Sequence, residues 1–112
     1  MACIFCRIAS GDLPSEILYQ DEKVIAIRDI NPQAPTHVLI MPKTHIPAVA
    51  DVTDEEGALL ARLVHVANLL AKNEGIAEQG YRLVTNCGPN AGQAVPHLHF
   101  HLLGGRELGG LG

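Results

Sequence analysis

Most apolar positions of the chain fall in short runs, and one longer stretch repeats them at helical intervals. Residues 16–20 and 23–28 are rich in β-branched and aromatic side chains, and Asp21 and Glu22 separate them, so this spacing predicts a β-hairpin. Residues 37–41 predict a third strand that ends before Pro42. Residues 81–85 and 95–103 predict two further strands, with a loop of Gly, Pro and Asn between them.

Residues 53–73 predict the long helix. Thr53 and Glu56 have the spacing of a capping box at its start, and Gly75 follows its end. Residues 4–9 predict a short helical turn. Strands outnumber helices and short connections favour antiparallel pairing, so we expect an α+β fold with a five-stranded antiparallel sheet, one long helix and one short helix. Four apolar residues of the long helix are expected to face the core: Leu59, Leu63, Val66 and Leu70.

Composition limits the kinds of partner. The chain has 112 residues, 47% of them hydrophobic and 18% charged, which suits one packed domain. The net charge of −4 is dispersed along the chain, so we expect no nucleic-acid polymer as a partner. No apolar run approaches the roughly 20 residues that span a bilayer, so no membrane association is expected. The first residues lack the basic and apolar regions of a secretory signal, which favours a cytoplasmic protein.

Three histidines near the end of the chain, His97, His99 and His101, alternate with apolar residues. In a β-strand, alternate side chains share a face, so three imidazoles would stand side by side while their neighbours enter the core. An ordinary core strand has no need for such a row of histidines. The row is compatible with a transition-metal site, because imidazole is a common metal ligand. It is also compatible with nucleotide chemistry, because imidazole titrates near neutral pH and can act as a nucleophile or proton donor.

A loop of glycines and amides precedes this row. Its candidate phosphate-binding residues are Asn86, Gly92 and Gln93, because glycines allow backbone N–H groups to point inward and amides add donors. Such loops are more often plain turns. Next to three histidines, the loop becomes a candidate cradle for a single phosphate.

The segment His-Leu-His-Phe-His-Leu-Leu is the signature of the histidine-triad (HIT) superfamily, and three further segments resemble its Hint branch. These are residues 29–37, the Gly92–Gln93 step and the Leu-Gly-Gly-Arg segment at 103–106. The resemblance implies a single HIT domain over residues 1–112, with a core at 4–106 and a short glycine-rich tail at 107–112.

The resemblance also implies residue roles. His99 matches the nucleophile that takes up the nucleotidyl group, and His101 matches the residue that contacts the phosphate and assists the leaving group. His97 and His37 match supporting histidines that set orientation and tautomer. Asp29 matches the carboxylate that accepts the ribose hydroxyls, a role that suits a group able to accept two hydrogen bonds. Four residues match the lining of the purine slot: Phe5, Ile8, Ile27 and Ile30.

The reaction implied is hydrolysis of purine nucleoside phosphoramidates through a nucleotidyl-histidine intermediate, with no metal required for catalysis. Ala94 departs from the family, since similar proteins usually have a serine or another polar residue there to hold the leaving group. Two alternatives stay open: hydrolysis of diadenosine polyphosphates, and an AMP-binding adaptor with little turnover, which Ala94 makes more credible. A homodimer is implied, formed through the long helix and the strand at 81–85.

The pair Cys3-x-x-Cys6 has the spacing of half a tetrahedral zinc site. By itself the pair could also be two small hydrophobic side chains. Zinc-bearing members of the superfamily complete the pair with two histidines, and the matching residues here are His45 and His97. The resemblance thus implies a possible structural Zn²⁺ bound by Cys3, Cys6, His45 and His97. The chain has three cysteines and no export signal, which argues against a disulfide framework.

Overall fold

A computed structural model describes residues 3–112; Met1 and Ala2, the first two residues of the expected domain, lie outside the described part. The five strands form one antiparallel sheet in the order β1-β2-β3-β5-β4. The α+β architecture expected from the sequence is therefore confirmed. The helices are α1 (Ile4–Ala9) and α2 (Gly57–Asn73), and the strands are β1 (Ile17–Gln20), β2 (Val24–Arg28), β3 (Thr36–Pro42), β4 (Tyr81–Val84) and β5 (Phe100–Gly104).

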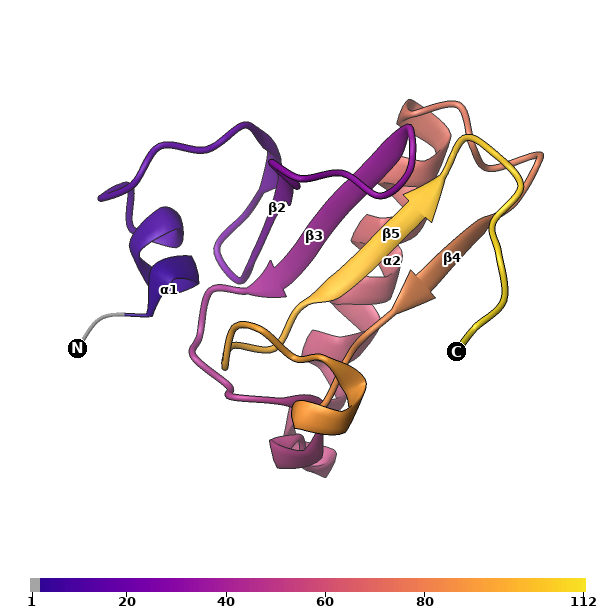
Figure 1. Ribbon diagram of the computed structural model, residues 1–112. Helices are drawn as coiled ribbons and strands as arrows, with labels where there is room; N and C mark the ends of the chain where they lie inside the picture. The colour runs from indigo at the N-terminus through magenta and orange to yellow at the C-terminus, as the bar shows by residue number, and fades with distance from the viewer. Residues whose placement is uncertain (1–2) are drawn as a thin grey trace.

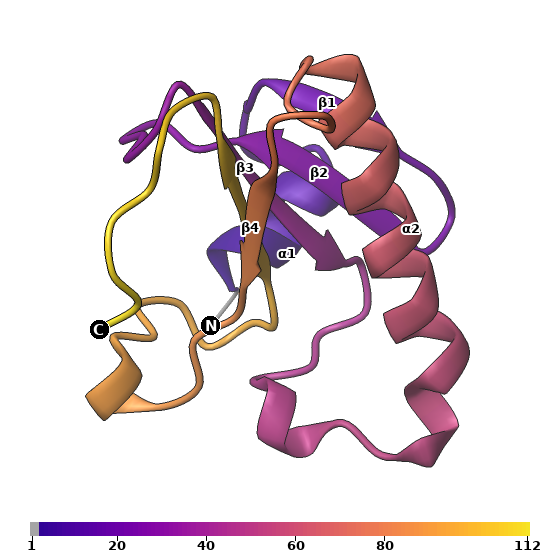
Figure 2. The ribbon, with the colours of Figure 1, turned by 90° about the vertical axis from the view of Figure 1, so that its right-hand side faces the viewer.

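The two helices contact opposite faces of the sheet. Helix α2 runs along the face turned away from the viewer in Figure 1 and stands beside the sheet in Figure 2. It buries Leu63, Val66 and Leu70, with Leu59 partly buried beside them, as the helical spacing predicts. Helix α1 packs Phe5 and other apolar residues against the opposite face, over β2 and β3. The histidine row lies on this second face.

The long helix begins and ends as its sequence signals indicate. The Thr53 hydroxyl accepts from the Glu55 N–H, and the Glu56 carboxylate accepts from the Thr53 N–H at 2.7 Å, which completes the capping box. The first turn, Asp54–Glu56, is a 3-10 turn, and α2 proper starts at Gly57. Gly75, with φ of +74°, follows the C-cap residue Glu74 in the left-handed conformation that ends many helices.

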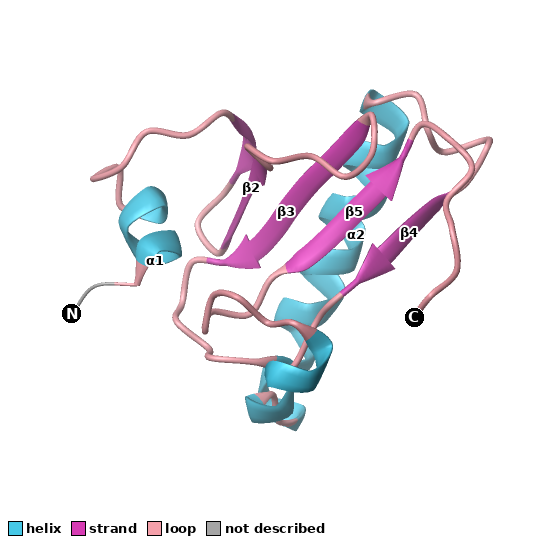
Figure 3. Ribbon diagram, viewed as in Figure 1, coloured by secondary structure: helices cyan, strands magenta, loops and turns pink. Residues whose placement is uncertain are grey.

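The last strand is shorter than the sequence pattern suggests, because β5 begins at Phe100 rather than at residue 95. Pro96 has no backbone N–H to donate to a sheet, and the N–H of His97 turns back to the carbonyl of Val95 at 2.8 Å. The N–H of Leu98 donates to Ile46, in the segment after β3, at 2.6 Å. Residues 95–99 therefore follow an irregular path, drawn as a loop in Figure 3.

Within residues 3–112, no helix combines the length and the apolar character needed to cross a membrane.

Candidate active site

Four imidazoles and one phenyl ring form a continuous row on the α1 side of the sheet. Phe5 contacts the rings of both His97 and His99, with ring centres 5.8 and 5.0 Å away. The row continues from His99 to His101 at 5.1 Å and from His101 to His37 at 5.2 Å. Of the three alternating histidines, His101 alone lies in β5, so the irregular segment before it carries the other two into line.

The proton on His99 is assigned by a backbone partner. Nδ1 of His99 lies 2.6 Å from the carbonyl oxygen of His97, and a carbonyl only accepts, so Nδ1 carries the proton. In the neutral ring, Nε2 then holds a lone pair. His99 is 8% exposed, and the tautomer that this contact selects has its lone pair on Nε2, where a nucleophile requires it.

A second chain of contacts assigns the protons of His37 and His101. The backbone N–H of Gln33 donates to Nδ1 of His37 at 3.0 Å, so the proton of the neutral His37 ring lies on Nε2. Nε2 of His37 lies 2.9 Å from Nδ1 of His101 and donates to it. The remaining proton of His101 is therefore on its own Nε2. The two rings form a relay that ends in an N–H donor.

Burial keeps this relay neutral. Loss of water lowers the pKa of His37, against a smaller opposite effect of Asp29. Burial, together with the positive charge that His99 and His37 would carry, lowers the pKa of His101 to about 4. Both rings are therefore uncharged near pH 7, which is the state that the hydrogen-bond assignment requires.

Asp29 lies at the end of the row. Its Oδ2 is 3.4 Å from Nε2 of His37, and its Oδ1 accepts from the backbone N–H of Asn31 at 2.8 Å. The side chain is 19% exposed, so the carboxylate can still be reached from solvent. The sequence places Asp29 far from the triad in the chain, and the fold brings it beside His37.

Asp29, His37 and His101 place three possible ligand atoms within 4.8 Å of one another. Two histidines and a carboxylate are a common ligand set for transition metals. A metal at Nε2 of His37 would need a lone pair on that nitrogen, but the N–H of Gln33 keeps the proton there by occupying Nδ1. The group is therefore a hydrogen-bonded relay in which the proton of His37 stands where a metal would have to bind.

A second group of possible metal ligands, the cysteine cluster, consists of Cys3, Cys6, His45 and His97. Its His97 carries the ring proton in a place that leaves a lone pair directed at the other three residues, unlike His37. Nε2 of His97 donates to the carbonyl of Pro42 at 2.8 Å, which leaves a lone pair on Nδ1. That nitrogen lies 3.3 Å from Sγ of Cys3, 3.6 Å from Sγ of Cys6 and 3.2 Å from Nδ1 of His45. Ligand atoms at the edges of a zinc tetrahedron are separated by about 3.3–3.8 Å, given ordinary Zn–N and Zn–S bond lengths.

The chemistry of this donor set also fits a cation. Burial and the neighbouring Cys3 thiol raise the pKa of Cys6, so the site disfavours thiolates unless a positive charge joins them. All four donor atoms lie within 4.8 Å of one another, and the three cysteines of the described chain are free of disulfides. The residues present therefore fit a tetrahedral metal with four protein ligands and no open position.

The apolar residues expected at the purine slot divide into two groups. Phe5, Ile8 and Ile27 are buried in one cluster beneath the histidine row. Ile30, in the loop after β2, is 97% exposed and contributes nothing to that cluster. The structure brings three of the four expected residues together and leaves Ile30 as a free apolar side chain near Asp29.

In the loop before the triad, Gln93 acts as a clamp. Its Oε1 accepts from the N–H of Gly88 at 3.0 Å, and its Nε2 donates to the carbonyls of Pro47 and Val95 at 2.8 and 3.0 Å. Both amide protons are thus used within the protein. Gly92 has φ of +81°, a conformation that favours glycine, and its own N–H donates to Pro89. Asn86 lies half-buried at the start of the loop.

Sequence reasoning missed the polar backbone groups that set the ring protons. Gln33 was expected only as part of a resembling segment, and no side-chain pattern marks its N–H as the partner of His37.

Cys87, which as a small apolar side chain would be expected to pack inside, is exposed.

Comparison with known proteins identifies the family to which the chain belongs. A family model described as HIT domain matches residues 10–108. The purine nucleoside phosphoramidase of Escherichia coli (strain K12) is 54% identical over 106 residues, which cover 95% of this chain and 89% of that protein. The chain belongs to the HIT family. A 14 kDa zinc-binding protein of Zea mays is 49% identical to this HIT protein over 107 residues, with 94% of this chain and 83% of that protein covered.

Solved structures agree with that assignment. A HIT family hydrolase from Clostridium thermocellum superposes on this HIT protein with a TM-score of 0.94 at 54% identity, covering 97% of this chain and 95% of that one. The resemblance stated from the triad motif is therefore confirmed, as is the HIT fold. These relatives support a hydrolase acting on nucleotides.

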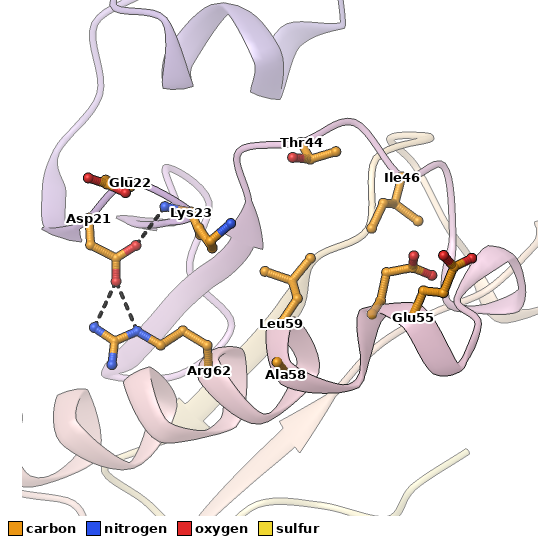
Figure 4. Close-up of a pocket in the computed structure, with 10 residues that line it drawn as sticks. Asp21, Glu22, Lys23, Thr44, Ile46, Glu55, Ala58, Leu59 and Arg62 are labelled. Carbon is orange, nitrogen blue, oxygen red and sulfur yellow. Dashed lines mark hydrogen bonds and ion pairs between the residues drawn. The ribbon is translucent and has the colours of Figure 1, made fainter.

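A large cavity of this HIT protein lies away from the histidine row. A space of about 670 Å³ opens between the β1–β2 turn and the start of α2, with Leu59 and Ile46 at its floor (Figure 4). Asp21 and Arg62 form an ion pair of 2.8 Å at one end. The cavity borders the triad region only through the segment around His45, since its lining includes none of the row's residues.

Proposed function

We propose that this protein hydrolyses purine nucleoside 5′-phosphoramidates through a covalent nucleotidyl-His99 intermediate. The observation that carries the proposal is the pair of opposite proton assignments on neighbouring rings. His99 offers a lone pair on Nε2, and His101 offers a proton on Nε2. A displacement at phosphorus needs both groups together: a nucleophile for the phosphorus and a donor for the leaving nitrogen. The name of the Escherichia coli relative supports the choice of substrate class.

In the first step, Nε2 of His99 forms a bond to the α-phosphorus and the P–N bond breaks. Its electron pair goes to the leaving nitrogen, which takes the Nε2 proton of His101 and departs as an amine. The His101 ring is left with a negative charge, which the positive charge on the nucleotidyl-His99 ring balances until water restores both rings. In the second step, a water oxygen attacks the phosphorus and the P–Nε2 bond breaks, returning its electrons to His99. One water proton restores His101 and the other stays with the nucleoside monophosphate.

The carboxylate of Asp29 is assigned to the ribose hydroxyls, because it is partly exposed and retains acceptor capacity on Oδ2. The purine is assigned to the apolar surface formed by Phe5, Ile8 and Ile27, with Ile30 closing over it. Asn86 and Gly92 are assigned to the phosphate loop. Gln93 would support that loop as a clamp rather than touch the phosphate with its side chain, since both of its amide protons are engaged.

We also propose a structural Zn²⁺ bound by Cys3, Cys6, His45 and His97. Such an ion would supply no chemistry to the displacement. It would fix His97, whose carbonyl holds Nδ1 of His99 and thereby sets the nucleophile's tautomer.

The test is acid quenching with an adenosine phosphoramidate carrying a radioactive α-phosphorus. We expect label trapped on His99, identified by mass spectrometry of the digested protein. His99→Ala should lose the adduct and at least about 10³-fold in kcat while still binding AMP, because only the nucleophile is removed. His65→Ala, an exposed change on α2, is the control and should behave as wild type.

The two alternative functions give other outcomes of the same experiment. Faster turnover of a diadenosine polyphosphate than of the phosphoramidate would favour that substrate class. AMP binding with no trapped label and no turnover would favour an adaptor and contradict the proposal.

A further inference from the structure

The turn that follows β5 contacts the loop between β2 and β3 in two places. A guanidinium N–H of Arg106 donates to the carbonyl oxygen of Gln33 at 2.8 Å. Beside it, Gly105 approaches Pro35 so closely that a β-carbon there would lie 2.8 Å from Cβ of Pro35, and its φ is +96°. A side chain at position 105 would therefore push the two segments apart. This contact gives the Gly-Gly-Arg segment a physical role that the displacement chemistry alone does not assign.

Gln33 is held from both sides. Its carbonyl accepts from Arg106, and its N–H donates to Nδ1 of His37 at 3.0 Å. The Gln33 N–H decides the tautomer of His37, and His37 in turn decides that of His101 through the 2.9 Å contact between them. A link thus runs from an exposed arginine to the N–H donor at the end of the relay.

We infer that Arg106 is a positioning residue for the proposed reaction: it holds Gln33 so that the protons of His37 and His101 stay on Nε2. The inference rests on the proposed function for its kinetic consequence only. When Arg106 is removed, the N–H of Gln33 is held less firmly and His37 gains access to the Nδ1–H tautomer. His101 must then donate from Nδ1 to His37, and its Nε2 has no proton for the leaving group.

Nitrogen-15 NMR of the histidine rings tests the tautomers directly, without any substrate. The wild-type protein should show His37 and His101 as Nε2–H tautomers, assigned with single histidine-to-asparagine variants. Arg106→Ala should shift the ring nitrogens of both residues toward a mixture of tautomers. Arg106→Lys keeps a donor that can reach a carbonyl and should restore much of the wild-type pattern.

Arg82→Ala is the matched control. Arg82 also donates to a backbone carbonyl, that of Gly109 at 2.9 Å, but this carbonyl belongs to the C-terminal tail. Removing Arg82 should leave the signals of His37 and His101 unchanged. A shift of equal size in this variant would show that loss of any arginine disturbs the rings, and would overturn the inference.

The kinetic readout compares two leaving groups. An alkylamine needs a proton to depart, whereas an activated leaving group such as a nitrophenolate needs none. Arg106→Ala should lower kcat on the alkylamine substrate about five- to tenfold and change kcat on the activated substrate less than about twofold, since part of the general-acid contribution is lost. Equal losses on both substrates would overturn the catalytic part of the inference.

Failure of the inference and failure of the proposed function are distinguishable. Unchanged ring signals in Arg106→Ala overturn the inference whatever the rates are. If the wild-type protein turns over neither substrate, the proposed function fails, and the NMR comparison alone still decides whether Arg106 sets the tautomers.

Discussion

His101 lies in an environment that opposes protonation. Its ring is partly buried, and the rings of His99 and His37 lie within hydrogen-bond or contact distance. Burial is the main cause of the lowered pKa, about 4 against an ordinary 6.5. The unfolded chain therefore binds a proton between about pH 6.5 and pH 4 that the folded protein does not bind. By linkage, stability falls as the pH is lowered through this window.

This difference gives a prediction for His101→Asn. Between pH 7 and pH 4.5 the wild-type protein should lose about 2 kcal/mol more unfolding free energy than the variant, because the variant has no imidazole to protonate. Urea unfolding at the two pH values measures the difference. Any metal lost from the cysteine cluster at low pH is lost from both proteins and cancels. Equal losses in both would contradict the assigned burial effect.

Ala94 gives a second prediction at this scale. The residue is exposed next to Gln93, and its side chain has no hydrogen-bond donor. Ala94→Ser should raise kcat on a phosphoramidate about fivefold, because one hydrogen bond to the leaving group contributes about 1 kcal/mol. Ala91→Ser places a hydroxyl on another exposed residue of the same loop and should change nothing. Steady-state rates of the wild-type protein and the two variants measure the effect. An unchanged rate in Ala94→Ser would show that the side chain at position 94 does not contact the leaving group.

The side chains of the site were predictable from the sequence, but their proton assignments were not. Alternation along the chain marked His99 and His101 as candidates, whereas His37 and Asp29 were expected only from the resemblance to the HIT family. The groups that assign the protons are the N–H of Gln33 and the carbonyls of His97 and Pro42. Every residue but proline carries a backbone N–H and every residue a carbonyl, so only the fold reveals which ones meet a ring.

At the scale of elements, the cysteine cluster joins three parts of the chain. Cys3 and Cys6 belong to the start of α1, His45 follows β3, and His97 precedes β5. Helix α1 is six residues long, and its N-cap residue makes no capping hydrogen bond through its side chain. A helix of this length is marginal without tertiary support. The cluster therefore anchors an element that contributes Phe5 to the histidine row.

Metal removal should consequently weaken the protein. Treatment with a strong chelator, or Cys3→Ser combined with Cys6→Ser, should lower Tm by about 10 °C, because metal binding contributes folding free energy when it bridges distant segments. Cys87→Ser, a change at an exposed cysteine outside the cluster, is the control and should leave Tm unchanged. Differential scanning calorimetry with metal analysis measures both. A chelated protein with wild-type Tm would contradict the structural role.

Element boundaries were predictable where local signals dominate. The capping box of α2 and the glycine after it are short-range features, so the helix was located correctly. The strand expected over residues 95–103 depended on alternation alone. Pro96 and the bond from Leu98 to Ile46 break the ladder, and the second of these is a tertiary contact that no local pattern contains.

At the scale of the whole molecule, the two edges of the sheet differ. Strand β4 forms one edge, and its Tyr81 donates to Asn68 of α2 at 2.6 Å, so this strand and the helix present a continuous surface. Two large side chains of this surface are exposed: Val64 and Tyr81, at 42 and 37%. Strand β1 forms the other edge and exposes Ile17 at 43%. An unpaired edge strand beside exposed apolar residues favours pairing with a second copy.

We therefore predict a twofold dimer formed through β4 and α2, which would join two sheets into one. Analytical ultracentrifugation should give twice the chain mass of 12.0 kDa for the wild-type protein. Val64→Glu should yield the monomer, because a carboxylate from each chain would be buried without a partner across the interface. Ile17→Glu adds a carboxylate at the opposite edge and should stay dimeric. A monomeric wild-type protein, or dissociation by Ile17→Glu alone, would exclude the β4–α2 surface as the interface.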